Sequence, residues 1–254
     1  MSISDHRMMK RIFLIIRFFC LNAFIVIHSI MACLWGITIS IFDRDNNIVH
    51  RWCAVPWARI ILWVCGIKVE VRGIIDIKKD VPFIYMSNHQ SYFDIFTLLA
   101  CLPADFKFLM KQELMKIPLL GTTMRKAGYL SVDRGDTRNA IKSMDMAVEK
   151  IRNGASVLVF PEGTRSEDGH VQAFKKGGFH MAIKAGCDIV PIAVVNSRAI
   201  VPKGSLRINK GTIKMNIGRP IPVKDYSKRD INDLIERTRE AVISQMAKIE
   251  RTGI

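Results

Sequence analysis

The chain has 254 residues, of which 49% are hydrophobic and 24% are charged. These near-average shares exclude a disordered or fibrous protein. Lys and Arg number 38 against 23 Asp and Glu, a formal net charge of +15, which points to an anionic partner: nucleic acid, anionic lipid or an acidic protein. Mean hydropathy is nevertheless +0.16, so apolar residues must be concentrated in one part of the chain.

The first such part lies near the N-terminus. From Phe18 to Phe42 there is no Asp, Glu, Lys or Arg, and residues 7–17 before it are rich in basic side chains. About 20 apolar residues suffice for a membrane-spanning helix. A signal peptide is the alternative, although its apolar region is usually about 7–15 residues long and precedes a small-residue cleavage site. The basic flank predicts a cytoplasmic N-terminus.

A second segment, from about residue 50 to 67, contains Trp52, Trp57 and Trp63. Tryptophan favours the headgroup zone of a bilayer, and a short, charged segment is typical of an interfacial helix. We therefore predict that residues 1–67 form a membrane-embedded helical pair that dips into the bilayer and returns. The remainder then stays on the cytoplasmic side of the inner membrane. Burial of both helices in a soluble core is the alternative.

From residue 68 onward, short β-like runs alternate with helical patterns. This alternation predicts a second domain, residues 68–254, with an α/β fold: a mixed, largely parallel sheet flanked by helices. The predicted strands are 68–72, 82–87, 129–133, 156–160, 189–195 and 212–217. The predicted helices are 92–101, about 137–152, 177–186 and 229–250.

The motif NHQSYFD, residues 88–94, directly follows the second predicted strand. On a continuous helix the five-residue spacing would place His89 and Asp94 about 140° apart. If His89 lies in the turn before the helix, Asp94 can accept from one imidazole nitrogen and leave the other free to take a proton. A helix cap formed by Ser91 with Asp94 is the alternative. The spacing alone leaves both open.

The segment GYLSVDR, residues 128–134, reads as a strand that ends in a basic residue. Arg134 could bind an anion there. A surface salt bridge with Asp133 or Asp136 is the simpler interpretation of these residues by themselves.

The segment FPEGTRS, residues 160–166, follows the apolar strand SVLVF. In open α/β sheets ligands collect at the carboxyl ends of strands. Gly163 permits a tight turn, and Arg165 carries a planar guanidinium suited to phosphate. An ordinary surface turn is the alternative, since these residue types are common in turns.

Several common catalytic signatures are missing from the sequence. There is no G-x-S-x-G, H-E-x-x-H, Walker A or G-x-G-x-x-G motif, which excludes the common serine hydrolases, zincins and standard nucleotide-binding enzymes. The six cysteines form no C-x-x-C pair, which is typical of a reducing compartment and offers no zinc site.

In type and order the motifs resemble those of the glycerolipid acyltransferases, in particular the bacterial 1-acylglycerol-3-phosphate acyltransferases. The resemblance covers about residues 66–222, and separate blocks in the right order make it highly specific. It is carried by NHxxxxD at 88–94, KQEL at 111–114, GYLSVDR at 128–134, FPEGTRS at 160–166, FKKG at 174–177 and VPI at 190–192. It implies a glycerol-3-phosphate acyltransferase-like fold tethered by a membrane-embedded helical pair.

The resemblance also implies roles for individual residues. His89 would be the general base and Asp94 its orienting partner, so that the hydroxyl of the acceptor lipid attacks a thioester carbonyl without an enzyme nucleophile. The residues implied in substrate binding are Arg165 and Arg134 for the phosphate, Glu162 and Gly163 for the glycerol, Thr164 in the same acceptor loop, and Lys111, with Lys107 as the alternative, near the developing oxyanion.

The implied reaction converts lysophosphatidate to phosphatidic acid with an acyl-CoA or acyl-carrier-protein donor, and it needs no cofactor or metal. The positive charge would then serve docking on anionic lipid and attraction of an acidic donor, rather than nucleic-acid binding. Two alternatives remain: the same chemistry on another lysolipid, or a non-catalytic membrane lipid-binding protein. The His89–Asp94 pair argues against the second, since a binding module needs no base.

Overall fold

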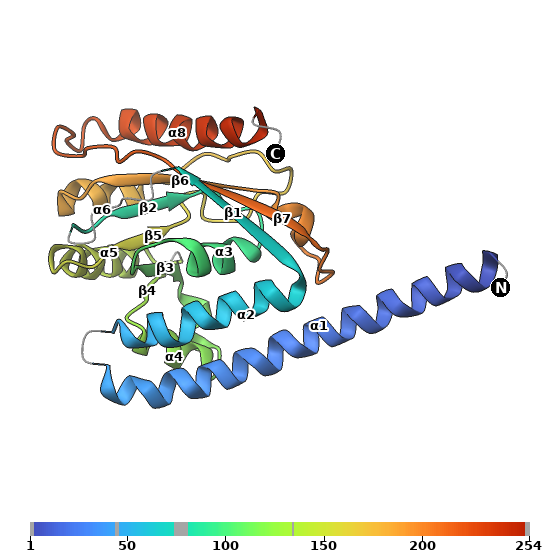
Figure 1. Ribbon diagram of the computed structural model, residues 1–254. Helices are drawn as coiled ribbons and strands as arrows, with labels where there is room; N and C mark the ends of the chain where they lie inside the picture. The colour runs from blue at the N-terminus through green and yellow to red at the C-terminus, as the bar shows by residue number, and fades with distance from the viewer. Residues whose placement is uncertain (1–2, 44–45, 74–80, 134, 252–254) are drawn as a thin grey trace.

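A computed structural model describes residues 3–43, 46–73, 81–133 and 135–251 (Figure 1). Within these residues seven strands form one sheet in the order β1-β7-β6-β2-β5-β3-β4. The strands are β1 (Ile67–Gly73), β2 (Ile84–Ser87), β3 (Lys107–Lys111), β4 (Leu130–Val132), β5 (Val157–Val159), β6 (Ile189–Val195) and β7 (Gly211–Ile217).

The sheet is largely parallel, as predicted. Among the neighbouring strand pairs of the described chain, only β6 and β7 run antiparallel. Strands β2 to β6 therefore point the same way, and their carboxyl ends meet at one edge of the sheet. This edge is where an open α/β sheet places a ligand site.

Helices cover both faces of the sheet. They are α1 (Ile3–Ile39), α2 (Val55–Cys65), α3 (Phe93–Cys101), α4 (Leu120–Lys126), α5 (Thr137–Arg152), α6 (Gly177–Ala185), α7 (Ser197–Ile200) and α8 (Ile231–Arg251). Short helical turns lie at Ser40–Phe42, His50–Ala54 and Gln112–Lys116.

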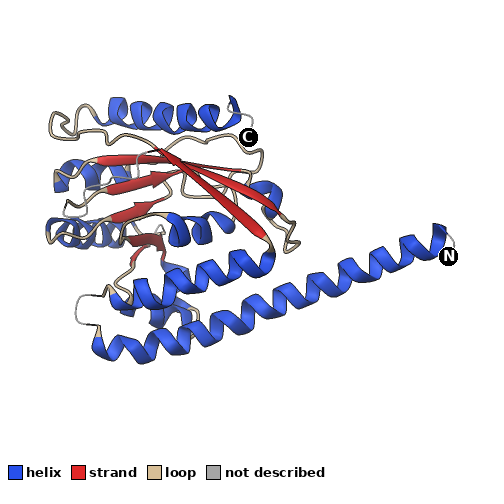
Figure 2. Ribbon diagram, in the orientation of Figure 1, coloured by secondary structure: helices blue, strands red, loops and turns tan. Residues whose placement is uncertain are grey.

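Strand β2 shows how the two faces are built. Tyr85 packs in one apolar cluster, and its neighbours Ile84 and Met86 pack in another on the opposite face, because successive side chains of a strand alternate in direction. Buried residues of α2 and α3 join the first cluster, and those of α5, α6 and α8 join the second. The result is a sheet with helices on both faces (Figure 2).

Helix α1 is the one described helix that is long and apolar enough to cross a membrane. The segment Arg7–Phe42 contains an 18-residue stretch of mean hydropathy 2.1, none of which is buried. Helix α2 is different. Its Ile61 and Leu62 are buried in the same cluster as Tyr85, whereas Trp63 is 79% exposed. Helix α2 therefore shares the core of the α/β part. The predicted domain boundary after residue 67 stays a prediction.

The predicted elements match the structure closely, but strand β3 and the short helices α4 and α7 were not predicted. The six predicted strands and four predicted helices are present with ends shifted by at most two residues, and β6 has the predicted bounds. Strand β3 was missed because its sequence, KFLMK, has a lysine at each end. Helix α4 was missed because its seven residues are too few to show a helical period.

Helix α1 is seated closely on the rest of the chain at Gly36. A Cβ atom there would lie 2.8 Å from Cγ2 of Thr123 and 2.9 Å from Sγ of Cys53. The Thr123 hydroxyl also donates to the carbonyl oxygen of Cys33 at 3.2 Å. The absence of a side chain at Gly36 thus allows α1 to contact α4.

A Gly36→Leu substitution should therefore destabilise the protein. Leucine has the better helix propensity, so a loss of stability would come from the clash with Thr123 and Cys53, at a cost of about 1–3 kcal/mol. We expect a melting temperature in detergent several degrees below wild type. The control is Gly135→Ala, whose added Cβ meets nothing closer than 3.4 Å. Equal melting temperatures for the two variants would contradict this seating of α1.

Candidate active site

The turn after β2 is fixed first by Asn88. Its side-chain amide donates to the carbonyl oxygen of Val194 at 2.8 Å, and its Oδ1 accepts from the amide of Val194 at 2.8 Å. Both residues are buried. This pair of hydrogen bonds ties the end of β2 to β6, so the chain enters His89 from a defined position.

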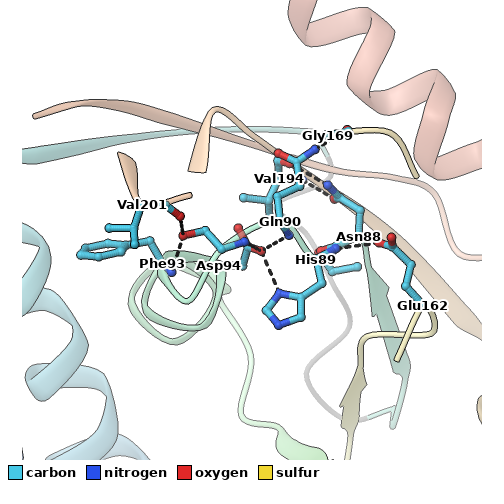
Figure 3. Close-up of polar contacts among 11 residues, drawn as sticks. Asn88, His89, Gln90, Phe93, Asp94, Glu162, Gly169, Val194 and Val201 are labelled. Carbon is cyan, nitrogen blue, oxygen red and sulfur yellow. Dashed lines mark hydrogen bonds and ion pairs between the residues drawn. The ribbon is translucent and has the colours of Figure 1, made fainter. Parts of the chain in front are cut away.

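His89 and Asp94 meet in one of the two arrangements that the motif left open. Helix α3 begins at Phe93, so Asp94 lies in its first turn and His89 lies before it. Nδ1 of His89 is 2.9 Å from Oδ2 of Asp94. The Asp94 side chain is fully buried, and the imidazole is 14% exposed. Figure 3 shows one ring nitrogen directed at Asp94 and the far edge of the ring turned away from it.

The alternative, a helix cap formed by Ser91 with Asp94, is met only in part, because the N-cap of α3 is Tyr92, which makes no side-chain cap hydrogen bond. Oδ2 of Asp94 also accepts from the backbone amides of Gln90 at 2.6 Å and Ser91 at 2.9 Å. The Ser91 hydroxyl accepts from the amide of Phe93 at 3.3 Å. Asp94 Oδ1 has no hydrogen-bond partner among the described residues. One carboxylate oxygen therefore both shapes the turn and orients His89.

The segment 160–166 wraps around His89 from the neighbouring strand β5. The ring of Phe160 stacks on the imidazole with centroids 4.0 Å apart and an interplanar angle of 16°. At the other end of the segment, the amide of Ser166 donates to the carbonyl oxygen of His89 at 2.8 Å. The segment thus forms one wall of the site, as expected for a loop at the carboxyl edge.

The side chain of Glu162, which belongs to this segment, is buried. It is 2% exposed. Its Oε1 accepts from the backbone amide of His89 at 2.8 Å, and its Oε2 accepts from the amide of Gln172 at 3.1 Å. Burial raises the pKa of Glu162 to about 7, against the opposing effect of the two amide hydrogen bonds.

A residue that the sequence did not indicate supports this arrangement from α8. The guanidinium of Arg239 donates to the carbonyl oxygens of Val171 at 3.1 Å and Gln172 at 3.3 Å. Its positive charge also favours ionisation of Glu162, although less strongly than burial opposes it. A chain of contacts therefore runs from α8 through Gln172 and Glu162 to the backbone of His89.

The guanidinium of Arg165 is held in place but keeps one hydrogen-bond donor without a partner among the described residues. The guanidinium lies 3.8 Å above the ring of Tyr92 in a cation–π contact. Its Nη1 is buried and has no hydrogen-bond partner among the described residues. A buried N–H without a partner is costly, which makes this position suited to an anionic oxygen. Nearby, Thr164 is exposed and Gly163 adopts φ 75° in the turn.

The two candidate lysines lie at opposite ends of β3. Lys111 ends the strand at the carboxyl edge, is more than half exposed and pairs with Glu113 at 2.9 Å. Lys107 begins the strand and contacts Asn46 and Asn47. Burial lowers the pKa of Lys107 to about 8. Lys111 is therefore the lysine at the edge that carries His89.

Arg134 lies outside the described residues. Strand β4 ends at Val132, at the carboxyl edge, two residues earlier. The contact of Arg134 with the acceptor phosphate therefore stays a prediction.

Residues 68–195 match the family model described as Acyltransferase. The chain belongs to the acyltransferase family. It is 38% identical over 183 residues to the chloroplastic 1-acyl-sn-glycerol-3-phosphate acyltransferase BAT2 of Brassica napus, covering 71% of this chain and 53% of that protein. It is 31% identical over 194 residues to the human 1-acyl-sn-glycerol-3-phosphate acyltransferase alpha, covering 76% of this chain and 69% of that protein.

A solved structure shares the fold over almost its whole length. The crystal structure of the 1-acyl-sn-glycerophosphate (LPA) acyltransferase PlsC from Thermotoga maritima has a TM-score of 0.71 and 27% identity. The match covers 92% of this chain and 96% of that chain. By contrast, the chain spans about half the length of the Brassica and Arabidopsis relatives that it matches.

The raised pKa of Glu162 makes stability depend on pH. Because the folded-state pKa of about 7 exceeds the ordinary value of 4.5, this group's contribution is fully present below pH 4.5 and is lost as the pH rises to about 7. We expect a loss of roughly 1–3 kcal/mol over that range. Unfolding free energies measured between pH 4.5 and 7.5 should show this slope in wild type and a shallower one in Glu162→Gln. Parallel curves for the two proteins would show that burial of this carboxyl has no such effect.

Proposed function

We propose that this protein transfers an acyl group from an acyl thioester to the sn-2 hydroxyl of 1-acyl-sn-glycerol-3-phosphate, giving phosphatidic acid. The observation that carries the proposal is the His89–Asp94 pair, 2.9 Å apart at the carboxyl edge of the sheet. The names of the relatives support the choice of acceptor.

The proposed chemistry follows from the orientation of His89. A carboxylate only accepts hydrogen bonds, so Nδ1 of His89 carries its proton toward Asp94 and Nε2 is left as the base. Nε2 takes the proton of the acceptor hydroxyl as that oxygen attacks the thioester carbonyl. When the tetrahedral intermediate collapses, the carbon–sulfur bond breaks and the proton passes from Nε2 to the leaving thiolate. The imidazole is thereby restored.

The acceptor phosphate has a proposed place beside Arg165. Its buried, unpartnered Nη1 supplies a donor there, and a planar guanidinium can bind two phosphate oxygens. We propose that Arg134 shares this charge, that Gly163 and Thr164 line the acceptor site in the same loop, and that Lys111 lies near the developing oxyanion.

For Glu162 we propose a positioning role in place of a direct contact with the glycerol. Both of its oxygens are engaged by backbone amides and the side chain is 2% exposed. A buried carboxyl group with both oxygens hydrogen-bonded can fix the backbone of His89, but it has little exposed surface for contact with a substrate.

The proposed location is the cytoplasmic face of the inner membrane, with α1 in one leaflet. Leu21 and Ile25 of α1 pack against the apolar cluster of the α/β part, and the carbonyl of Cys33 accepts from Thr123. An upright span over residues 18–42 would carry those contacts, and the domain with them, into the hydrocarbon. A helix that lies along the interface avoids this cost. The donor, acyl-CoA or acyl-carrier protein, would then approach from the cytoplasm.

The base is tested by His89→Ala in an acyl-transfer assay with lysophosphatidate and either donor, in detergent or liposomes. General-base catalysis is worth about 10²- to 10⁴-fold, so kcat should fall by at least 10². The control is His180→Ala, an exposed histidine on α6, which should match wild type. Unchanged kcat in His89→Ala would overturn the proposed mechanism.

The acceptor site is tested by Arg165→Ala. Loss of a charge-assisted hydrogen bond to phosphate costs about 1.5–3 kcal/mol, so the KM for lysophosphatidate should rise about tenfold or more while the KM for the donor stays the same. Arg229→Ala, which removes an exposed arginine elsewhere, serves as the control. If Arg165→Ala leaves the acceptor KM unchanged, or if wild type prefers a lysolipid without a terminal phosphate, the acceptor assignment fails.

A further inference from the structure

The loop of residues 202–210, between α7 and β7, exposes an apolar side chain at its centre. Leu206 is 63% exposed, and no other large apolar side chain among the described residues after Trp63 is more exposed. A single exposed leucine is ordinary in a soluble protein. Its surroundings decide whether it has a role.

The loop lies against α1 (Figure 1). The side-chain amide of Asn22, near the start of the charge-free stretch, donates to the carbonyl oxygen of Leu206 at 3.2 Å. A groove of about 360 Å³ separates the loop from the preceding turns of α1. It is lined by Arg11, Leu14, Ile15, Phe18, Phe19 and Arg207. The apolar tip of the loop is therefore level with the point where α1 changes from basic to apolar.

The charge of the loop suits an anionic lipid surface. Residues 202–210 read PKGSLRINK, with Lys203, Arg207 and Lys210 and no acidic residue. Lys203 pairs with Glu167 at 2.9 Å, so Arg207 and Lys210 are the cations that carry the argument. The groove repeats this pattern, with an apolar wall and an arginine from each side. An apolar tip among long cationic side chains is typical of a segment that enters the headgroup zone, because the stems stay in apolar surroundings while the charges reach phosphate.

The base of the loop is also tied to the catalytic turn. Val201 directly precedes the loop, and its carbonyl oxygen accepts from the hydroxyl of Ser91 at 2.8 Å. The amide of Ser91 in turn donates to Asp94, the partner of His89. The depth of the loop in a membrane would therefore set the height of His89 above it.

We propose that residues 202–210 form a second membrane contact. Leu206 enters the acyl region, and the cationic side chains of the loop bind anionic phospholipid headgroups, with one lipid chain in the groove against α1. This contact holds the His89 site at headgroup level. The proposal rests on the proposed interfacial position of α1 and is independent of the proposed acyl transfer.

The test is a site-directed spin label in vesicles that contain phosphatidylglycerol and phosphatidylcholine. Leu206→Cys is labelled in a background with Cys20→Ser and Cys101→Ser, because Cys20 is exposed, Cys101 is partly exposed and the other cysteines are buried. Val26→Cys, 58% exposed on α1, is the membrane reference, and Ile243→Cys, 38% exposed on α8, is the aqueous reference. We expect the label at residue 206 to be more accessible to oxygen than to a water-soluble nickel chelate, as at residue 26.

The outcomes separate the two proposals. An aqueous signal at residue 206 with a membrane signal at residue 26 would overturn the loop contact and leave the position of α1 standing. Aqueous signals at both positions would overturn both. Arg207→Glu should reduce the oxygen preference at residue 206 in anionic vesicles, and the control Arg229→Glu should not. No effect of Arg207→Glu would show that headgroup binding is not part of the contact.

Discussion

Oδ2 of Asp94 is the atom on which the proposed site depends. It accepts from the amides of Gln90 and Ser91 and from Nδ1 of His89. Burial of a carboxylate is costly unless it is well hydrogen-bonded, and these three donors, together with the N-terminus of α3, offset that cost. The same bonds bring His89 back over the start of the helix. The five-residue spacing of the motif is thus a consequence of how the turn folds.

The rest of the scaffold holds this turn from two sides. Asn88 ties it to β6, and Glu162 ties it to the loop that Arg239 of α8 supports. His89, the proposed base, is therefore held by regular elements of the sheet and its helices, and its outer edge is the proposed substrate side. A site fixed in this way needs little rearrangement before it can act. It also means that a change in α8 can reach His89 through backbone hydrogen bonds.

The sequence predicted those features whose causes are local. The apolar run 189–195 marked β6 correctly, and the spacing of His89 and Asp94 allowed the contact that the two side chains make. Features whose causes lie far away in the chain were missed. The start of β3 is a buried lysine, which is tolerated because Asn46 and Asn47 accept from it. Glu162 accepts from the amide of Gln172, and Arg239 donates to the carbonyl oxygen of Gln172. Nothing in the motif FPEGTRS indicates these contacts.

The most direct test of the account is a double-mutant cycle on His89 and Asp94, with kcat measured for His89→Ala, Asp94→Asn and the double variant. If Asp94 acts in catalysis through His89, each single variant loses activity and the double variant is no slower than His89→Ala. Once His89 is removed, Asp94 has no catalytic partner left to orient. If the two losses multiply, Asp94 acts independently of His89, and the pair is not the catalytic unit proposed for this protein.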